Sequence, residues 1–179
     1  MRHVKRLRPA RRRERGFTMM ELAIATLVLM IGVVGIAQLV PASLKFDANN
    51  RVDTTAMVLA QREMDQIINQ PLTSTTFTDK DGNNISLGST TVSDTVFGGP
   101  VVMLGTSTSI NFGATAVANY NLTFTDPNDP TGPPYQMRWA VISKVNAGNV
   151  TSKRFIVGCY RNVAGQIMPP AVVDTMVEK

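Results

Sequence analysis

Residues 15–40 read RGFTMMELAIATLVLMIGVVGIAQLV, and this stretch decides what kind of protein the chain can be. From residue 22 to residue 44 there is no charged side chain, which makes 23 uncharged residues in succession. A helix of about 20 apolar residues spans the hydrocarbon core of a bilayer. A secretory signal peptide has a shorter apolar core, about 7–15 residues, that ends at a small-residue cleavage site. This run continues instead into PASLK at residues 41–45 and therefore predicts a membrane-spanning helix.

The charges of the chain are divided unevenly around that helix. There are 18 Lys and Arg against 13 Asp and Glu, but residues 1–16 alone carry +7 and the other 163 residues carry −2. Short segments rich in Lys and Arg stay in the cytoplasm, so everything after the helix should lie on the far side of the membrane. The basic composition therefore reports orientation, and binding to nucleic acid is not expected. A small basic patch on the last hairpin stays open as an alternative; its members would be Lys144, Lys153, Arg154 and Arg161.

Residues 43–70 have the spacing of an amphipathic helix, which Pro71 would end. Between the two helical segments, Gly32, Gly35 and Pro41 weaken the ladder of backbone hydrogen bonds. We therefore expect a bend or a melted turn within residues 32–41. The apolar stripe of the second segment, in which Glu63 is the one charged member, comprises Val52, Ala56, Leu59, Ala60, Met64, Ile67 and Ile68.

After Pro71 the sequence becomes rich in Thr, Ser, Gly and Asn, which is typical of strands and loops. Residues 117–125 alternate polar and apolar side chains and predict a half-buried strand, and residues 100–104 are a further candidate. The proline-rich segment 126–134 predicts an irregular loop. Residues 135–143 and 152–160 predict an antiparallel hairpin joined through NAGN at residues 146–149. One face of its first strand should carry Tyr135, Met137, Trp139 and Val141.

The junction of the basic segment and the apolar run reads RGFTMME at residues 15–21. It resembles the processing site of type IV pilin-like proteins: a basic leader that ends in Gly, followed by Phe, Thr, two apolar residues and Glu. With the leader, the apolar helix and the amphipathic helix included, the resemblance extends over residues 1–70. It implies that a membrane-embedded peptidase cuts between Gly16 and Phe17 on the cytoplasmic face. It also implies that the new amino group of Phe17 is methylated.

The resemblance assigns Glu21, together with Thr18, to filament assembly and register. A carboxylate inside an apolar span needs a partner, since it costs about 2.5–3.5 kcal/mol at mid-bilayer and less near the edge. Cleavage creates such a partner, the amino group of Phe17 on a neighbouring subunit or on the same one. Gly16 has no side chain, so its backbone can enter a narrow peptidase site. The competing interpretation is an uncleaved signal anchor whose Glu21 lies near the lipid headgroups.

Other polar clusters give weaker signals. DKDGNN at residues 79–84 is a fragment of a calcium loop, but it favours a hairpin turn. Asp126, Asn128 and Asp129 could gather a cation, although the flanking prolines favour a rigid loop. The single cysteine, Cys159, is expected to be a small buried residue. With one His and no nucleophile or phosphate-loop motif, we expect no enzyme activity, no metal and no cofactor.

Taken together, the sequence predicts an α+β fold in four segments: a basic leader at 1–16, a transmembrane or filament-core helix at 17–42, an amphipathic helix at 43–70 and a β-rich head at 71–179. Major pilins of the family close a C-terminal loop with a disulfide, which one cysteine excludes, and residues 168–179 hold no ligand cluster like that of calcium-stabilised major pseudopilins. Three stretches are similar to minor pilins or minor pseudopilins: VVGIAQ at 33–38, the residues around Glu63, and the pair Tyr135 and Trp139.

The expected function is therefore that of a non-enzymatic minor subunit of a type IV pilus or type II secretion filament. The subunit would sit in a bacterial inner membrane with a cytoplasmic N-terminus and pass into a periplasmic or extracellular filament. Its partners would be other pilin or pseudopilin subunits, the prepilin peptidase and an inner-membrane assembly platform. The alternative is a single-pass anchor for an extracytoplasmic binding or catalytic domain.

Overall fold

The computed structural model describes residues 16–162 and 169–178. The expected leader therefore lies outside the described residues apart from Gly16. The chain divides into two compact units, Met1–Phe46 and Asp47–Lys179, and each is described by itself. The helix α1, Met19–Ile68, contributes its first part to one unit and its last part to the other.

Residues 32–41 are helical throughout, Pro41 included, so the melted turn expected between Gly32 and Pro41 is not present in this helix. The residues on both sides of this segment are uncharged and mostly aliphatic. Because helix formation is cooperative, their backbone hydrogen bonds keep the helix continuous across Gly32, Gly35 and Pro41. The bend stays a prediction.

All the strands belong to the second unit. A sheet in the order β3-β7-β8-β9 forms its centre, and every pairing is antiparallel. On the same side of β7, β3 pairs with residues 140–142 and β6 pairs with residues 135–138. Two small hairpins, β1-β2 and β4-β5, stand beside it. The bounds are β1 Thr76–Thr78, β2 Asn84–Ser86, β3 Val96–Gly98, β4 Val101–Leu104, β5 Ser107–Ile110, β6 Asn121–Phe124, β7 Tyr135–Asn146, β8 Asn149–Arg161 and β9 Ala171–Glu178.

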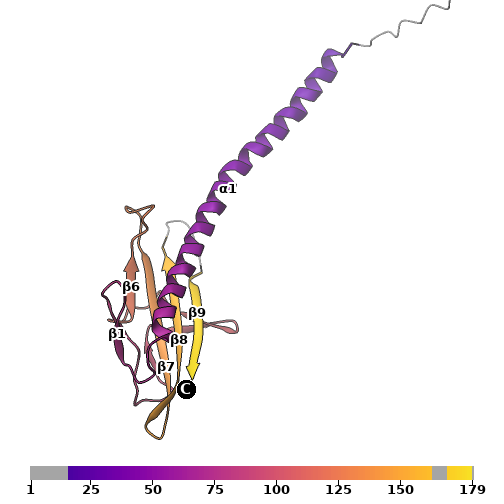
Figure 1. Cartoon of the computed structure of the whole chain (residues 1–179). Coiled ribbons are helices and arrows are strands. Elements are labelled where there is room, and N and C mark those ends of the chain that lie inside the picture. The colour runs from indigo at the N-terminus through magenta and orange to yellow at the C-terminus, as the bar shows by residue number, and fades with distance from the viewer. Residues whose placement is uncertain (1–15, 163–168, 179) are drawn as a thin grey trace, which may run out of the picture. The chain divides into compact units, whose positions relative to one another are not determined.

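The main core lies between the last part of α1 and one face of this sheet (Figure 1). From the helix it takes the predicted stripe, and Ala56 and Ala60 are small enough to let the helix approach the strands closely. From β7 it takes the predicted face, because alternate side chains of a strand point the same way. The β7 residues buried in this core are Tyr135, Met137, Trp139 and Val141.

The opposite face of the sheet is covered in part by the β4-β5 hairpin. Ile110 of β5 packs with Ala140 of β7 and Ile156 of β8 in a second, smaller core. Gly158 lies beneath this contact, and a Cβ there would approach the Ile110 side chain to 3.0 Å. The head is thus buried on both faces of its two longest strands.

A long apolar helix followed by a β-rich domain confirms the predicted α+β fold class. The β7-β8 hairpin and the β4 strand are where the sequence predicts them. The strand expected at residues 117–125 is shorter, because Asn119 has a positive φ of 63° and breaks the extended backbone before β6. The sequence did not predict β9, the edge strand that pairs with β8.

Candidate functional site

Residues 16–18 precede the helix, and Thr18 and Glu21 close its first turn. The backbone N–H of Thr18 donates to Glu21 Oε2 over 2.9 Å, and the Thr18 hydroxyl donates to the same oxygen over 3.0 Å. In return the N–H of Glu21 donates to Thr18 Oγ1 over 3.2 Å. This reciprocal arrangement is a capping box, which satisfies N–H groups that have no partner within the helix. Glu21 therefore has a local role besides the assembly role expected of it.

Gly16 and Phe17 are exposed, and within residues 16–162 and 169–178 no side chain packs against Gly16. A Cβ built on Gly16 would meet no atom within 4 Å, and 86% of Phe17 is exposed. The fold itself would accept a larger residue at position 16. Nothing in the described part of the chain requires glycine there.

The apolar part of α1 is exposed around its whole circumference. No residue from 17 to 46 is buried, and the helix is long and apolar enough to cross a membrane. A Cβ on Gly32 or Gly35 would likewise meet no atom within 4 Å. In water such a surface would drive association, so this unit needs lipid or other protein chains around it.

The two polar clusters of the head are occupied by the chain's own groups. Asp79, which is buried, caps the turn between β1 and β2: Oδ1 accepts the N–H groups of Asp81 and Asn83, and Oδ2 accepts the Asn83 amide. Gly82 in this turn has a φ of 86°. The segment is thus the hairpin turn that the sequence favours.

The second cluster surrounds the guanidinium of Arg161, at the end of β8. Its Nη1 lies 2.9 Å from Asp126 Oδ2, its Nη2 lies 2.7 Å from Asp129 Oδ2, and its Nε donates to the carbonyl of Pro133. The Asn128 N–H and the nearby guanidinium groups of Arg161 and Arg51 lower the pKa of Asp126, although its burial opposes them. The proline-rich loop is therefore closed by an internal cation.

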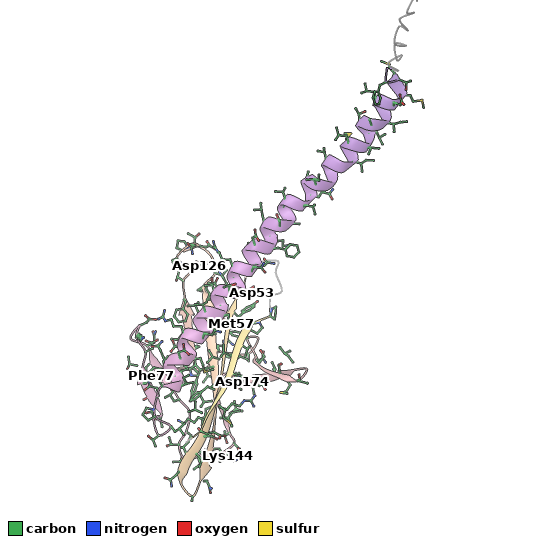
Figure 2. The ribbon with its side chains drawn as sticks, turned by 45° about the vertical axis from the view of Figure 1, so that its right-hand side comes forward. Asp53, Met57, Phe77, Asp126, Lys144 and Asp174 are labelled. Carbon is green, nitrogen blue, oxygen red and sulfur yellow. The ribbon has the colours of Figure 1, made fainter. Side chains whose placement is uncertain are left out.

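Three of the four residues of the basic patch proposed for the last hairpin have partners within the head. Lys153 is buried, and its Nζ donates to the carbonyls of Ser74 and Leu87 over 2.7 and 2.9 Å. Arg154 pairs with Asp174 of β9, and Arg161 is buried in the loop contact. Of the four residues, only Lys144 is exposed and has no ion pair with a described residue. Figure 2 shows it at the β7-β8 turn, at the opposite end of the sheet from Asp126.

Comparison with protein families found a match over residues 11–37 to the family described as the prokaryotic N-terminal methylation motif. The matched segment contains Gly16, Phe17, Thr18 and Glu21, and it confirms the resemblance to type IV pilin-like proteins. It supports a pilin-like or pseudopilin-like substrate of a prepilin peptidase, and the long apolar helix supports anchoring in a membrane. Comparison with curated proteins and with solved structures found no match.

The sequence did not reveal the capping role of Thr18 and Glu21, although Thr-x-x-Glu before an apolar run is a known signature of it. It also did not reveal the Arg161 contact, because the partners stand 32 and 35 residues away along the chain.

Proposed function

We propose that this chain is a minor pilin or pseudopilin subunit, cut between Gly16 and Phe17, methylated at Phe17 and then assembled into a filament. One observation carries the proposal: the exposed Gly16-Phe17 bond stands directly before a capped helix whose apolar first part, residues 19–46, is exposed on every side. A peptidase needs the bond to be accessible, and a filament needs an apolar helix with no partner in its own chain.

Both expected environments of the helix follow from its exposure. Before assembly, lipid surrounds residues 22–44, and the basic leader keeps the N-terminus in the cytoplasm of a bacterial inner membrane. After assembly, the helices of neighbouring subunits replace the lipid in a periplasmic or extracellular filament. The assembly platform in the inner membrane would perform this exchange.

Glu21 connects processing to assembly in this proposal. In the uncut chain its carboxylate binds the N–H and the hydroxyl of Thr18. Cleavage adds a cationic amino group at Phe17, one residue before Thr18, and in a filament the same group of a neighbour can reach Glu21. Charge neutralisation inside an apolar bundle would then favour one axial position of each subunit over others.

The minor class rests on the head. Cys159 is buried and has no cysteine partner, since the chain holds one cysteine, so the disulfide-closed loop of major pilins is absent. The loop 126–134 is closed by Arg161 instead. We propose a structural role for this head, with no catalytic one.

The test is processing in membranes. The full chain is expressed with and without a prepilin peptidase, and the intact mass and the N-terminal sequence are determined. We expect a chain that begins with methylated Phe17 only when the peptidase is present. Gly16→Val should block the cut, whereas Gly16→Ala, which adds one methyl group, should retain part of it. A product that still begins at Met1 with the peptidase present would refute the proposal.

The alternative, a membrane-tethered binding or catalytic domain, differs in its dependence on Glu21. In Glu21→Ala that is still cut at Gly16, a filament subunit should no longer be incorporated at the wild-type level. A tethered domain should be unaffected, because its span merely becomes more apolar. Thr18→Ala is the comparison variant: it removes the side-chain part of the cap and keeps the carboxylate. A smaller loss of incorporation than in Glu21→Ala would assign the effect to the carboxylate.

A further inference from the structure

Glu63 is a carboxylate inside the core of the head. It belongs to the buried stripe of α1, between Ala60 and Ile67, and is 1% exposed. Its Oε2 accepts a hydrogen bond from the Gln66 amide over 3.0 Å, whereas Oε1 is buried and has no hydrogen-bond partner. Among the residues that the structure describes, no Lys or Arg forms an ion pair with it. A buried carboxylate so poorly partnered is strongly disfavoured in its charged form.

A single side chain joins this carboxylate to the β1-β2 turn. The amide nitrogen of Gln66 donates to Glu63, and its oxygen accepts the backbone N–H of Lys80 over 3.0 Å. The turn itself is organised by Asp79, and Phe77, just before the turn, packs against the main core beside α1 (Figure 2). A cleft of about 590 Å³, lined in part by Arg62, Gln66 and Lys80, borders this contact.

The charges around Glu63 are mostly of its own sign. From the turn, Asp79 and Asp81 repel it, and from its own helix Arg62 attracts it but pairs with Asp81. From β8, Lys153 is held by two carbonyls, and burial keeps the Cys159 thiol neutral by raising its pKa to about 12. Burial first, and then Asp79, raise the pKa of Glu63 to about 7.

We propose that Glu63 is a proton-controlled contact that ties the β1-β2 turn to the end of α1, tight when the carboxyl group is neutral and loosened when it is ionised. The neutral group accepts the hydrogen bond from Gln66 without placing a charge in the core. The ionised group is repelled by the turn and gains by admitting water, which separates Gln66 from Lys80. In a head that faces outward, which rests on the function proposed above, the contact responds to the pH of the surroundings.

The direction of the pH effect follows from proton binding. Between pH 4.5 and about 7 the folded state holds a proton on Glu63 that the unfolded state has lost. Stability contributed by this group is therefore complete below pH 4.5 and decreases as the pH rises to about 7. The pH range of the measurement should end near 7.5. Burial lowers the pKa of Lys153 to about 8, so above pH 7.5 the titration of Lys153 would overlap with that of Glu63.

The test uses the full chain in detergent micelles and does not require processing or assembly. Carboxyl groups of Glu are labelled with ¹³C and titrated by NMR, and the melting temperature is followed by the fluorescence of Trp139, the single tryptophan. We expect a Glu63 midpoint near 7 and a melting temperature that falls by roughly 5 °C from pH 5 to 7.5. Hydrogen exchange at Lys80, corrected for intrinsic rates, should accelerate over the same range.

Glu63→Gln is the diagnostic variant, because Gln has nearly the shape of Glu and is neutral at every pH. Glu178→Gln, on the exposed end of β9, is its control. Glu63→Gln should remove the pH dependence of the melting temperature and of hydrogen exchange at Lys80. Glu178→Gln should leave both pH dependences unchanged. A Glu63 midpoint near 4.5, or an unchanged pH profile in Glu63→Gln, would overturn the proposal. Neither result would bear on cleavage at Gly16.

Discussion

Arg161 and Arg154 stand on the same strand, and each pairs with aspartate, yet their surroundings differ. The Arg161 side chain is 3% exposed and lies over the ring of Tyr135, with its charge opposed by Asp126 and Asp129. The Arg154 side chain is 41% exposed, and Asp174 is its partner on the surface of the neighbouring strand. Removing one member of a buried pair leaves an uncompensated charge inside the protein, whereas water replaces an exposed partner.

Arg161→Gln should therefore release the loop 126–134 and lower the melting temperature by roughly 10 °C. Arg154→Gln, the matched control on β8, should change it by at most a few degrees. Fluorescence of Trp139 in the full chain reports both. If the two variants melt together, the Arg161 contact does not hold the loop. Asp126→Asn added to Arg161→Gln should restore part of the loss, because it removes the buried charge that Arg161 no longer neutralises, leaving Arg51 to water.

At the scale of an element, the turn of the β7-β8 hairpin has nearly the residues that its backbone conformation favours. Asn146 pairs with Asn149, and the two residues between them have positive φ, 49° for Ala147 and 79° for Gly148. This is the two-residue turn whose twist matches that of the strands, and it favours Asn-Gly. Ala147 is the one residue that does not fit, because its Cβ makes the left-handed conformation unfavourable.

Ala147→Asn should stabilise the head by about 0.5–1 kcal/mol, because Asn tolerates this conformation better than Ala does. Ala147→Val, with a branched side chain at the same φ, should destabilise it. Chemical unfolding of the full chain, monitored at Trp139, measures both. Equal stability of the two variants would show that the turn relaxes to another geometry.

The hairpin and the long helix could be predicted because their signals are local. Residues 135–143, with an apolar side chain at every second position of one face, specify a strand, and 23 uncharged residues specify a span. The strands β3 and β9 could not, since they are strands only through pairing with β7 and β8. For the same reason sequence spacing placed Glu63 on the buried face but left Lys153 and Arg161 among surface charges.

At the N-terminal site, too, the features that depend on neighbouring residues could be predicted, and those that depend on other molecules could not. The position of Gly16, Phe17 and Glu21 is a sequence pattern, and the family match over residues 11–37 agrees with it. The Thr18–Glu21 cap is local as well and follows from the same residues. What surrounds Gly32 and Gly35 in use depends on other molecules, so one chain cannot reveal it.

At the scale of the whole molecule, the two units satisfy their apolar residues differently. The second unit buries them between helix and sheet. In the first, every described residue is exposed, so its packing must be completed outside the chain. Substitutions in the first unit should therefore affect assembly far more than the stability of the head.

Gly32→Ala with Gly35→Ala tests this division. A Cβ at either position meets nothing within 4 Å, and the segment is already helical, so the isolated chain accepts both methyl groups. Helix propensity rises by up to about 1 kcal/mol at each site. Insertion and cleavage at Gly16 should continue, because neither depends on these positions.

Incorporation into the filament should fall, because small residues let helices approach closely and added methyl groups prevent it, while the stiffer helix adapts less well. Thr26→Ala separates the two causes: it raises helix propensity but removes atoms from the helix surface. A loss in the double variant alone would assign the effect to close packing at the glycines, and a loss in both would assign it to stiffness. If the double variant is processed and incorporated at the wild-type level, Gly32 and Gly35 are ordinary residues of a membrane helix, and no neighbour packs against them.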